Sequence, residues 1–165
     1  MLAWVAGACP RWEDLDVNLA DELDALIAAL EARSAPYALA GGLAVAVWGA
    51  PRATSDIDLL ARREDLGGLL EIAGSCGFSH QALPMRFADG MEVRRVTKLE
   101  GAESLTLDLL LVNDNLEEVW RSRVRLPRVG GEMSVVSRDG LIQMKLWANR
   151  AQDLYDIERL RELDR

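Results

Sequence analysis

The segment AGGLAVAVWGAPRATSDIDL, residues 40–59, places a glycine pair about fourteen residues before two aspartates that are separated by one residue. Residues 37–40 are apolar and predict a short buried strand, whereas residues 43–48 predict a small buried helix. Gly41 and Gly42 then form the tight turn between them. Glycines at such a corner let the backbone approach a ligand closely, and the N–H groups that begin a helix attract anions. The corner therefore suits a phosphate group.

Two carboxylates follow this corner and share a face. Residues 57–61 predict a second strand, and side chains alternate across a strand, so Asp56 and Asp58 point to the same side. Asp108 interrupts an otherwise apolar face of the predicted strand 105–112, where an ionised group is costly unless it is paired or bound to metal. Mg²⁺ prefers such oxygen ligands together with phosphates. We expect the three carboxylates to meet beside the glycine corner.

Each of these features alone has a simpler interpretation. An Asp-x-Asp pair is most often a solvated turn or a helix cap, and Asp108 alone would be a residue of an edge strand that faces water. The glycine pair alone would be a structural corner. Together, at the spacing of a strand, turn, helix and second strand, they favour a functional site.

Residues 40–59 resemble the signature of the polymerase-β-type nucleotidyltransferase superfamily, in particular its abortive-infection toxin-like and minimal nucleotidyltransferase branches. That signature runs from a glycine pair through a small helix, a glycine, an arginine and a threonine to Asp-x-Asp, with a third aspartate on a later strand. Asp108 and residues 141–157, which contain a lysine and two later aspartates, extend the resemblance over most of the chain.

The resemblance implies a Mg²⁺- or Mn²⁺-dependent enzyme that moves a nucleoside monophosphate from an NTP co-substrate to a hydroxyl and releases pyrophosphate. Asp56 and Asp58 would bind two metal ions, and Asp108 would bind one of them and help to deprotonate the attacking hydroxyl. The implied nucleotide-binding residues are Gly41, Gly42, Arg52, Thr54, Ser55 and Lys145. The glycines would cradle the triphosphate by backbone contact, while Arg52 and Lys145 are candidates to compensate phosphate charge.

Trp48 and Lys145 each allow a structural interpretation. Many relatives have a histidine where this chain has Trp48, and we interpret the tryptophan as a packing residue of an apolar helix. Lys145 lies close to the apolar stripe of its helix, so its stem would also suit a purely structural role, with Asp153 or Asp156 as ion-pair partners.

Composition narrows the class of protein. The chain has 165 residues, half of them apolar, which is enough for one domain with a sizeable core. Its net charge of −8 argues against wholesale capture of nucleic acid by electrostatics. Cys9, Cys76 and a single histidine, His80, support neither a disulfide framework nor a zinc site. No apolar stretch is long enough to span a membrane and no secretory signal opens the chain, so we expect a cytoplasmic protein without membrane contact.

The order of elements predicts an α/β (α+β) nucleotidyltransferase fold in which helices flank a mixed sheet. We expect one domain over residues 1–165, with its core at 37–136 and C-terminal helices at 137–165. The predicted helices lie at 19–33, 63–75, 137–149 and 152–163, and further strands at 85–87, 91–98, 104–112, 124–126 and 133–136.

The acceptor stays open between a small molecule, a tRNA or other RNA end, and a protein side chain. Arg121, Arg123 and Arg125 alternate along a predicted strand and would contact an RNA phosphate, or would keep an exposed edge strand from aggregating. The toxin-like resemblance adds an antitoxin as a possible partner. The alternative function is a non-catalytic nucleotide-binding or partner-binding module with the same fold. Oligomeric state and the preferred base are not readable from these residues.

Overall fold

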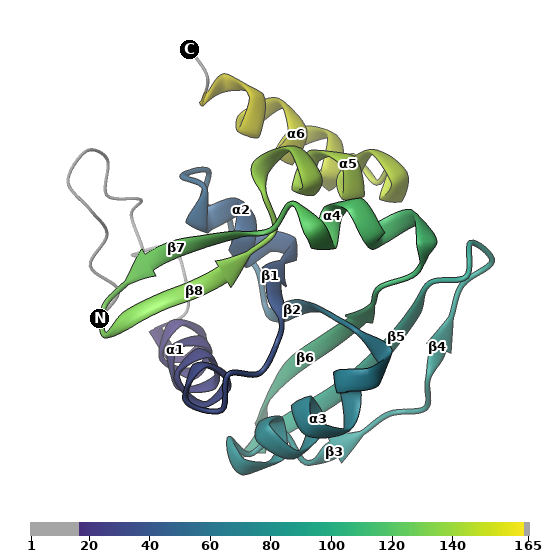
Figure 1. Ribbon diagram of the computed structural model, residues 1–165. Helices are drawn as coiled ribbons and strands as arrows, with labels where there is room; N and C mark the ends of the chain where they lie inside the picture. The colour runs from purple at the N-terminus through teal and green to yellow at the C-terminus, as the bar shows by residue number, and fades with distance from the viewer. Residues whose placement is uncertain (1–16, 164–165) are drawn as a thin grey trace.

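The computed structural model describes residues 17–163, which form an α+β fold with helices around one mixed sheet (Figure 1). The helices are α1 (Val17–Ala32), α2 (Gly41–Val47), α3 (Leu66–Ser75), α4 (Glu117–Arg121), α5 (Arg138–Ala148) and α6 (Ala151–Glu162). The strands are β1 (Ala38–Ala40), β2 (Asp56–Ala61), β3 (His80–Gln81), β4 (Met85–Arg86), β5 (Glu92–Glu100), β6 (Glu103–Leu111), β7 (Val124–Arg128) and β8 (Gly131–Val135).

Strand β2 lies near the middle of the sheet. The strand order is β3-β5-β6-β2-β1-β8-β7, and β4 pairs with β5 outside this path. β2 runs parallel to β6 and antiparallel to β1, and β1 is parallel to β8. The remaining pairs are antiparallel. The predicted fold class, a mixed sheet flanked by helices, is therefore confirmed.

The core of the protein is centred on β1, β2 and β6. All three residues of β1 are buried. Along β2, Ile57 and Leu59 are buried on one face of the sheet, so Asp56 and Asp58 project from the other. On β6, Leu107 and Leu109 alternate in the same way with Asp108. The strand alternation seen in the sequence thus directs the acidic side chains to one common face.

The helices gather at two places around the sheet. α1 and α3 contact each other in the lower half of Figure 1. α2 contacts β1, β2 and α5, and α5 contacts both α4 and α6, so these four helices cluster at the top of the view. The glycine corner and the C-terminal helices consequently lie together near β2.

Some local predictions differ from the structure. Gly41 and Gly42 form the first turn of α2 instead of a turn before it. The predicted helix 63–75 begins as a 3-10 turn at Arg63–Asp65 and becomes α-helical only at Leu66. Helix α4 and the short strand β3 were not predicted, because segments of two to five residues carry too little periodicity to be recognised.

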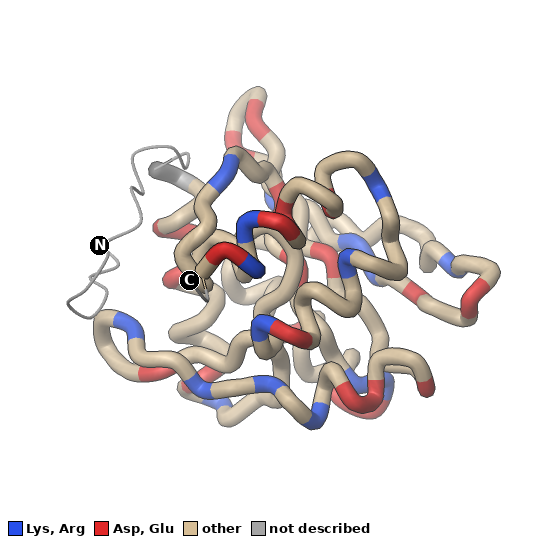
Figure 2. Tube along the Cα trace, turned by 90° about the horizontal axis from the view of Figure 1, so that it is seen from above, with Lys and Arg blue, Asp and Glu red and all other residues tan. Residues whose placement is uncertain are grey.

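The expected row of three arginines on one strand is wrong. Arg121 ends α4, where it pairs with Glu117, and Arg125 lies in β7, where it binds Glu31 through two hydrogen bonds. Arg123 lies over the ring of Trp120, with 4.1 Å from its guanidinium carbon to the ring centre. Each arginine is therefore held by a protein partner. In the view from above, Lys and Arg positions alternate with Asp and Glu positions over much of the chain, and several basic positions follow one another along the lower edge of the picture (Figure 2).

Candidate active site

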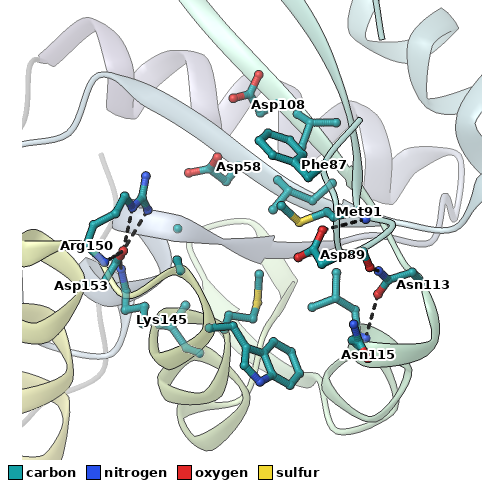
Figure 3. A pocket seen from close by; sticks show the side chains of 18 residues that line it. Asp58, Phe87, Asp89, Met91, Asp108, Asn113, Asn115, Lys145, Arg150 and Asp153 are labelled. Carbon is teal, nitrogen blue, oxygen red and sulfur yellow. Dashed lines mark hydrogen bonds and ion pairs between the residues drawn. The ribbon is translucent and has the colours of Figure 1, made fainter. Parts of the chain in front are cut away.

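Three carboxylates lie on one face of two neighbouring strands. Asp58 of β2 is the direct partner of Asp108 in the parallel β2–β6 pair, and Asp56 lies two residues before Asp58 on the same face. Asp108 is buried, with 8% of its surface exposed. Figure 3 shows the side chains of Asp58 and Asp108 on the same side of the sheet, at one wall of a cavity. The two strands that sequence alternation identified are therefore neighbours.

Gly41 approaches Asp58 so closely that an added side chain would have to displace the carboxylate. Its φ is +63°, a left-handed conformation that favours glycine. A Cβ built at this position would lie 1.9 Å from the Oδ2 atom of Asp58. At Gly42, a Cβ would lie 2.8 Å from the hydroxyl of Thr54 and 3.0 Å from the Nη2 atom of Arg52. The two glycines thus bring the start of α2 against the carboxylates on one side and against the loop before β2 on the other.

The pKa of the Asp58 carboxyl is strongly perturbed. It is raised to about 6, first by burial and then by the charges of Asp108 and Asp56, while Lys145 and Arg150 act in the opposite direction. A buried carboxyl that two other carboxylates repel is a site where a cation is stabilised. A raised pKa caused by burial and by charge partners is typical of functional sites.

A fourth charged side chain faces the three carboxylates. Arg95 of β5 is the direct strand partner of Asp108, so it lies on the same face. Its Nε atom donates to Oδ1 of Asp108 at 2.8 Å and its Nη2 atom donates to Oδ2 at 2.7 Å. Arg95 belongs to no motif in the sequence, and the register between β5 and β6, which brings it to Asp108, is not readable from either strand alone.

Lys145 belongs to a buried network of ion pairs that joins α5 to α6. Its ammonium donates to Asp156 at 2.6 Å and to Asp153 at 3.2 Å, and all three residues are at most 5% exposed. Arg52 donates through Nε to both carboxylate oxygens of Asp156, at 2.9 and 3.0 Å. Arg150 binds Asp153 through its Nε atom at 2.6 Å. This network connects the loop before β2 to the C-terminal helices.

The network gives Lys145 the structural partners that the sequence allowed. It also leaves Lys145 and Arg150 on the wall of the cavity, whereas Arg52 is not among the cavity-lining residues. The predicted roles of Lys145 and Arg52 toward a nucleotide stay predictions.

The cavity has a volume of about 710 Å³ and three kinds of wall (Figure 3). One wall contains Gly41, Asp58 and Asp108, and a second contains Lys145, Arg150 and Asp153 of the ion-pair network. The third wall is a mixture of apolar and amide side chains with one carboxylate, Asp89. Its other residues include Phe87, Met91, Asn113, Asn115, Met144 and Trp147. Sequence reasoning missed these last residues, since they lie in loops and on a helix face without a motif.

The other predicted positions lie at the edge of the site. The Ser55 hydroxyl donates to Asp56 at 3.2 Å, and Thr54 and Ser55 both line a smaller hollow of about 280 Å³. The indole N–H of Trp48 donates to the carbonyl of Val136 at 3.0 Å. Trp48 is therefore tied to the backbone next to β8, in agreement with a packing role.

The carboxylates offer suitable donors for a divalent cation. Among residues 17–163, no group of three His, Cys, Asp or Glu side chains is arranged to hold a metal ion as the side chains stand. Both oxygens of Asp108 accept hydrogen bonds from Arg95 instead. The donor set still fits the chemistry of Mg²⁺ or Mn²⁺, because the three carboxylates share a face, and burial and then repulsion by Asp108 and Asp56 raise the pKa of Asp58.

No protein-family model matches the chain, and no curated protein matches its sequence. Solved structures do share its fold. A protein from Thermotoga maritima, itself only proposed to be a nucleotidyltransferase, is 14% identical with a TM-score of 0.65, over 92% of this chain and 94% of that one. The antibiotic-resistance factor ANT(2'')-Ia, studied in solution, is 16% identical with a TM-score of 0.62, over 88% of this chain and 83% of that one.

A crystal structure of ANT(2'')-Ia in complex with adenylyl-2''-tobramycin is 17% identical, with a TM-score of 0.60 and coverage of 87% of this chain and 88% of that one. At these identities the likeness establishes the fold. The chain therefore has the nucleotidyltransferase fold, as the resemblance of residues 40–59 implied. Among residues 17–163 no helix is both long and apolar enough to cross a bilayer.

Proposed function

We propose that the protein is a metal-dependent nucleotidyltransferase that moves a nucleoside monophosphate from an NTP to a hydroxyl of a small molecule. The observation that carries the proposal is the direct pairing of Asp58 with Asp108 beside Gly41, whose missing side chain leaves the backbone against the carboxylate. In a nucleotidyltransferase fold, this combination favours a site for phosphoryl transfer over a purely structural role of the glycine corner.

In this proposal Asp56, Asp58 and Asp108 hold one or two Mg²⁺ or Mn²⁺ ions. Such ions, when bound, neutralise charge on the entering and leaving oxygens. Asp108 takes the proton of the attacking hydroxyl, since it is the carboxylate on the strand next to the apolar part of the cavity. Gly41 and Gly42 present backbone to the triphosphate.

The remaining nucleotide-binding assignments follow from position. Lys145 compensates phosphate charge from the cavity wall. Arg52 and Thr54 hold the loop against Gly42, so they act by fixing the glycine corner, and Ser55 orients Asp56 by its hydrogen bond.

A small-molecule acceptor is favoured by the walls of the cavity. Its basic lining residues, Lys145 and Arg150, both form ion pairs with Asp153, and the apolar and amide wall carries Asp89 as its ionised residue. Such a wall suits a ring with hydroxyl groups, whereas an RNA end would need cations for its phosphates. The complex of ANT(2'')-Ia with an adenylylated tobramycin agrees with this choice. A toxin–antitoxin setting stays a prediction from the resemblance.

The test is incubation of the full chain with each NTP, labelled on the α-phosphorus, and with Mg²⁺ or Mn²⁺. Separate reactions contain tobramycin, a small-molecule extract, or tRNA. We expect label to enter a small molecule with wild type and with Asp21→Asn, a control on the exposed side of α1, but not with Asp58→Asn. Equal labelling by wild type and Asp58→Asn would overturn the proposal. NTP binding without transfer to any acceptor would favour the non-catalytic module.

A further inference from the structure

Arg95 occupies a place in the sheet that the proposed reaction does not explain. It is paired with Asp108, and Asp108 is paired with Asp58, so the three residues form one row across β5, β6 and β2. All three side chains lie on the same face. Arg94, which precedes Arg95 on β5, points to the opposite face, where its Nη1 atom lies 3.7 Å from the Oε1 atom of Glu92. The row therefore places one guanidinium at the end of a line of carboxylates.

The contact between Arg95 and Asp108 uses both carboxylate oxygens. The two hydrogen bonds, 2.8 and 2.7 Å long, have the fork geometry in which arginine binds a carboxylate most strongly. Asp108 is buried, whereas the side chain of Arg95 is 41% exposed. The side chain of Arg95 is thus much more exposed to water than the carboxylate that it binds.

The charge of Arg95 acts on the whole site. Its pKa is raised first by the hydrogen bonds to Asp108, and then by the charges of Asp108, Asp56 and Asp58. The guanidinium consequently lies in the field of all three carboxylates. A divalent cation on these carboxylates would need the same oxygens of Asp108 and would be repelled by the same guanidinium.

We propose that Arg95 is the internal counter-ion of the carboxylate site, and that a divalent cation binds there in exchange for its hydrogen bonds to Asp108. This inference rests on the metal dependence of the proposed function. Arg95 is a positioning residue: it holds Asp108 in one orientation while the site lacks metal, and it weakens metal binding by the contact that must be broken. The exposure of its side chain gives Arg95 a route to leave Asp108.

The sign of the expected effect separates this role from simple structural support. Loss of a supporting residue would loosen the site and weaken metal binding. Loss of an internal counter-ion frees Asp108 and leaves more negative charge, so metal binding becomes tighter. We expect Arg95→Gln to tighten Mn²⁺ binding by about tenfold, the factor that corresponds to one pK unit of interaction. Arg95→Lys keeps the charge and should lie between Arg95→Gln and wild type.

The experiment is a Mn²⁺ titration of the full-length chain, in which electron paramagnetic resonance measures free Mn²⁺. Arg94→Gln is the matched control, since it removes the same charge from the other face of the same strand and should leave the affinity unchanged. Asp58→Asn should abolish binding. In parallel, the Nε–H resonance of Arg95 is followed by NMR as Mg²⁺ is added to wild type, where we expect it to shift.

The outcomes are separable. Tighter binding by Arg95→Gln alone, together with a shifted Arg95 resonance, supports the exchange. Equal or weaker binding by Arg95→Gln, with wild type still binding Mn²⁺, overturns the exchange and leaves the proposed function standing. If no protein in the series binds Mn²⁺, both proposals fail.

Discussion

Two clusters of ionised side chains each contribute residues to the wall of the same cavity, and they differ in the balance of their charges. On the sheet, three carboxylates, Asp56, Asp58 and Asp108, face one guanidinium, that of Arg95, which leaves a deficit of two positive charges. Between α5 and α6, the two carboxylates of Asp153 and Asp156 meet three cations, those of Arg52, Lys145 and Arg150, which leaves a surplus of one.

This difference indicates what each cluster is able to bind. The cluster between α5 and α6, which we call the surplus cluster, neutralises its own carboxylates, since Lys145 and both aspartates are buried in short ion pairs. Its one excess positive charge favours an anion such as a phosphate. The cluster on the sheet, which we call the deficit cluster, has two uncompensated negative charges, and one divalent cation would neutralise them. Asp58 and Asp108 of the first cluster and Lys145, Arg150 and Asp153 of the second line the cavity of Figure 3, so a metal–phosphate ligand would meet carboxylates at one wall and cations at the other. Four variants test this division, beginning with the largest expected effect.

Lys145→Ala should destabilise the protein most. The substitution leaves Asp153 and Asp156 buried with fewer counter-ions, and removal of one partner from a buried ion pair typically costs about 3–5 kcal/mol. The measurement is the free energy of unfolding from urea denaturation. Arg33→Ala, which removes an exposed ion pair with Glu71, is the control and should change it little. A change below about 1 kcal/mol in Lys145→Ala would contradict the description of this network as a buried structural unit.

Gly41→Ala should damage the other cluster. The Cβ of the new alanine would collide with the carboxylate of Asp58, and the positive φ at position 41 adds backbone strain. We therefore expect the free energy of unfolding to fall by about 3 kcal/mol. Nucleotidyl transfer should be lost as well, because Asp58 must move. Gly74→Ala is the control, since a Cβ there meets nothing within 4 Å. If Gly41→Ala keeps full stability and Mn²⁺ affinity, the close approach of Gly41 to Asp58 is not a feature of the protein in solution.

The contrast between the clusters also explains how much could be predicted from the sequence. The alternation of side chains along a strand is a local pattern, and it was sufficient to predict that Asp56, Asp58 and Asp108 lie on one face of the sheet. Arg95 required the register between β5 and β6, and the pairing of Arg52 with Asp156 required contact between residues 104 positions apart. Neither is encoded in a local period. The wall of Phe87, Asp89 and Asn113 comes from loops, whose conformation depends on the elements they join.

Asp58→Asn should stabilise the metal-free protein in a pH-dependent manner. The pKa of Asp58 is about 6 in the folded protein and near its usual value of 3.8 in the unfolded chain. Between these values the folded state holds a proton that the unfolded state has released, so the unfolding free energy of wild type falls as the pH rises. About two pK units correspond to at most about 3 kcal/mol.

The measurement is unfolding of both proteins in EDTA from pH 4 to pH 8. The advantage of Asp58→Asn should be absent near pH 4, grow up to about pH 6 and then level off. Added Mg²⁺ should stabilise wild type at pH 7.5 and leave Asp58→Asn unchanged, which reverses their order if the ion binds tightly enough. If the stability advantage of Asp58→Asn is constant across the pH range, the pKa of Asp58 is not raised in the folded protein.

Arg150→Ala should have the smallest effect on stability and a selective effect on function. Its side chain is 75% exposed, so the ion pair with Asp153 is screened by water and is worth below about 1 kcal/mol. Because Lys145 continues to neutralise Asp153, the network should survive. We expect KM for the NTP to rise about fivefold with little change in kcat, the pattern of lost ground-state binding. Arg159→Ala is the matched control, since Arg159 lies within α6, the helix that Arg150 caps, and donates to the hydroxyl of Tyr155 instead. A fall in kcat without a change in KM would instead mean that Arg150 acts only in the transition state, and the surplus cluster would then serve the chemical step as well as nucleotide binding.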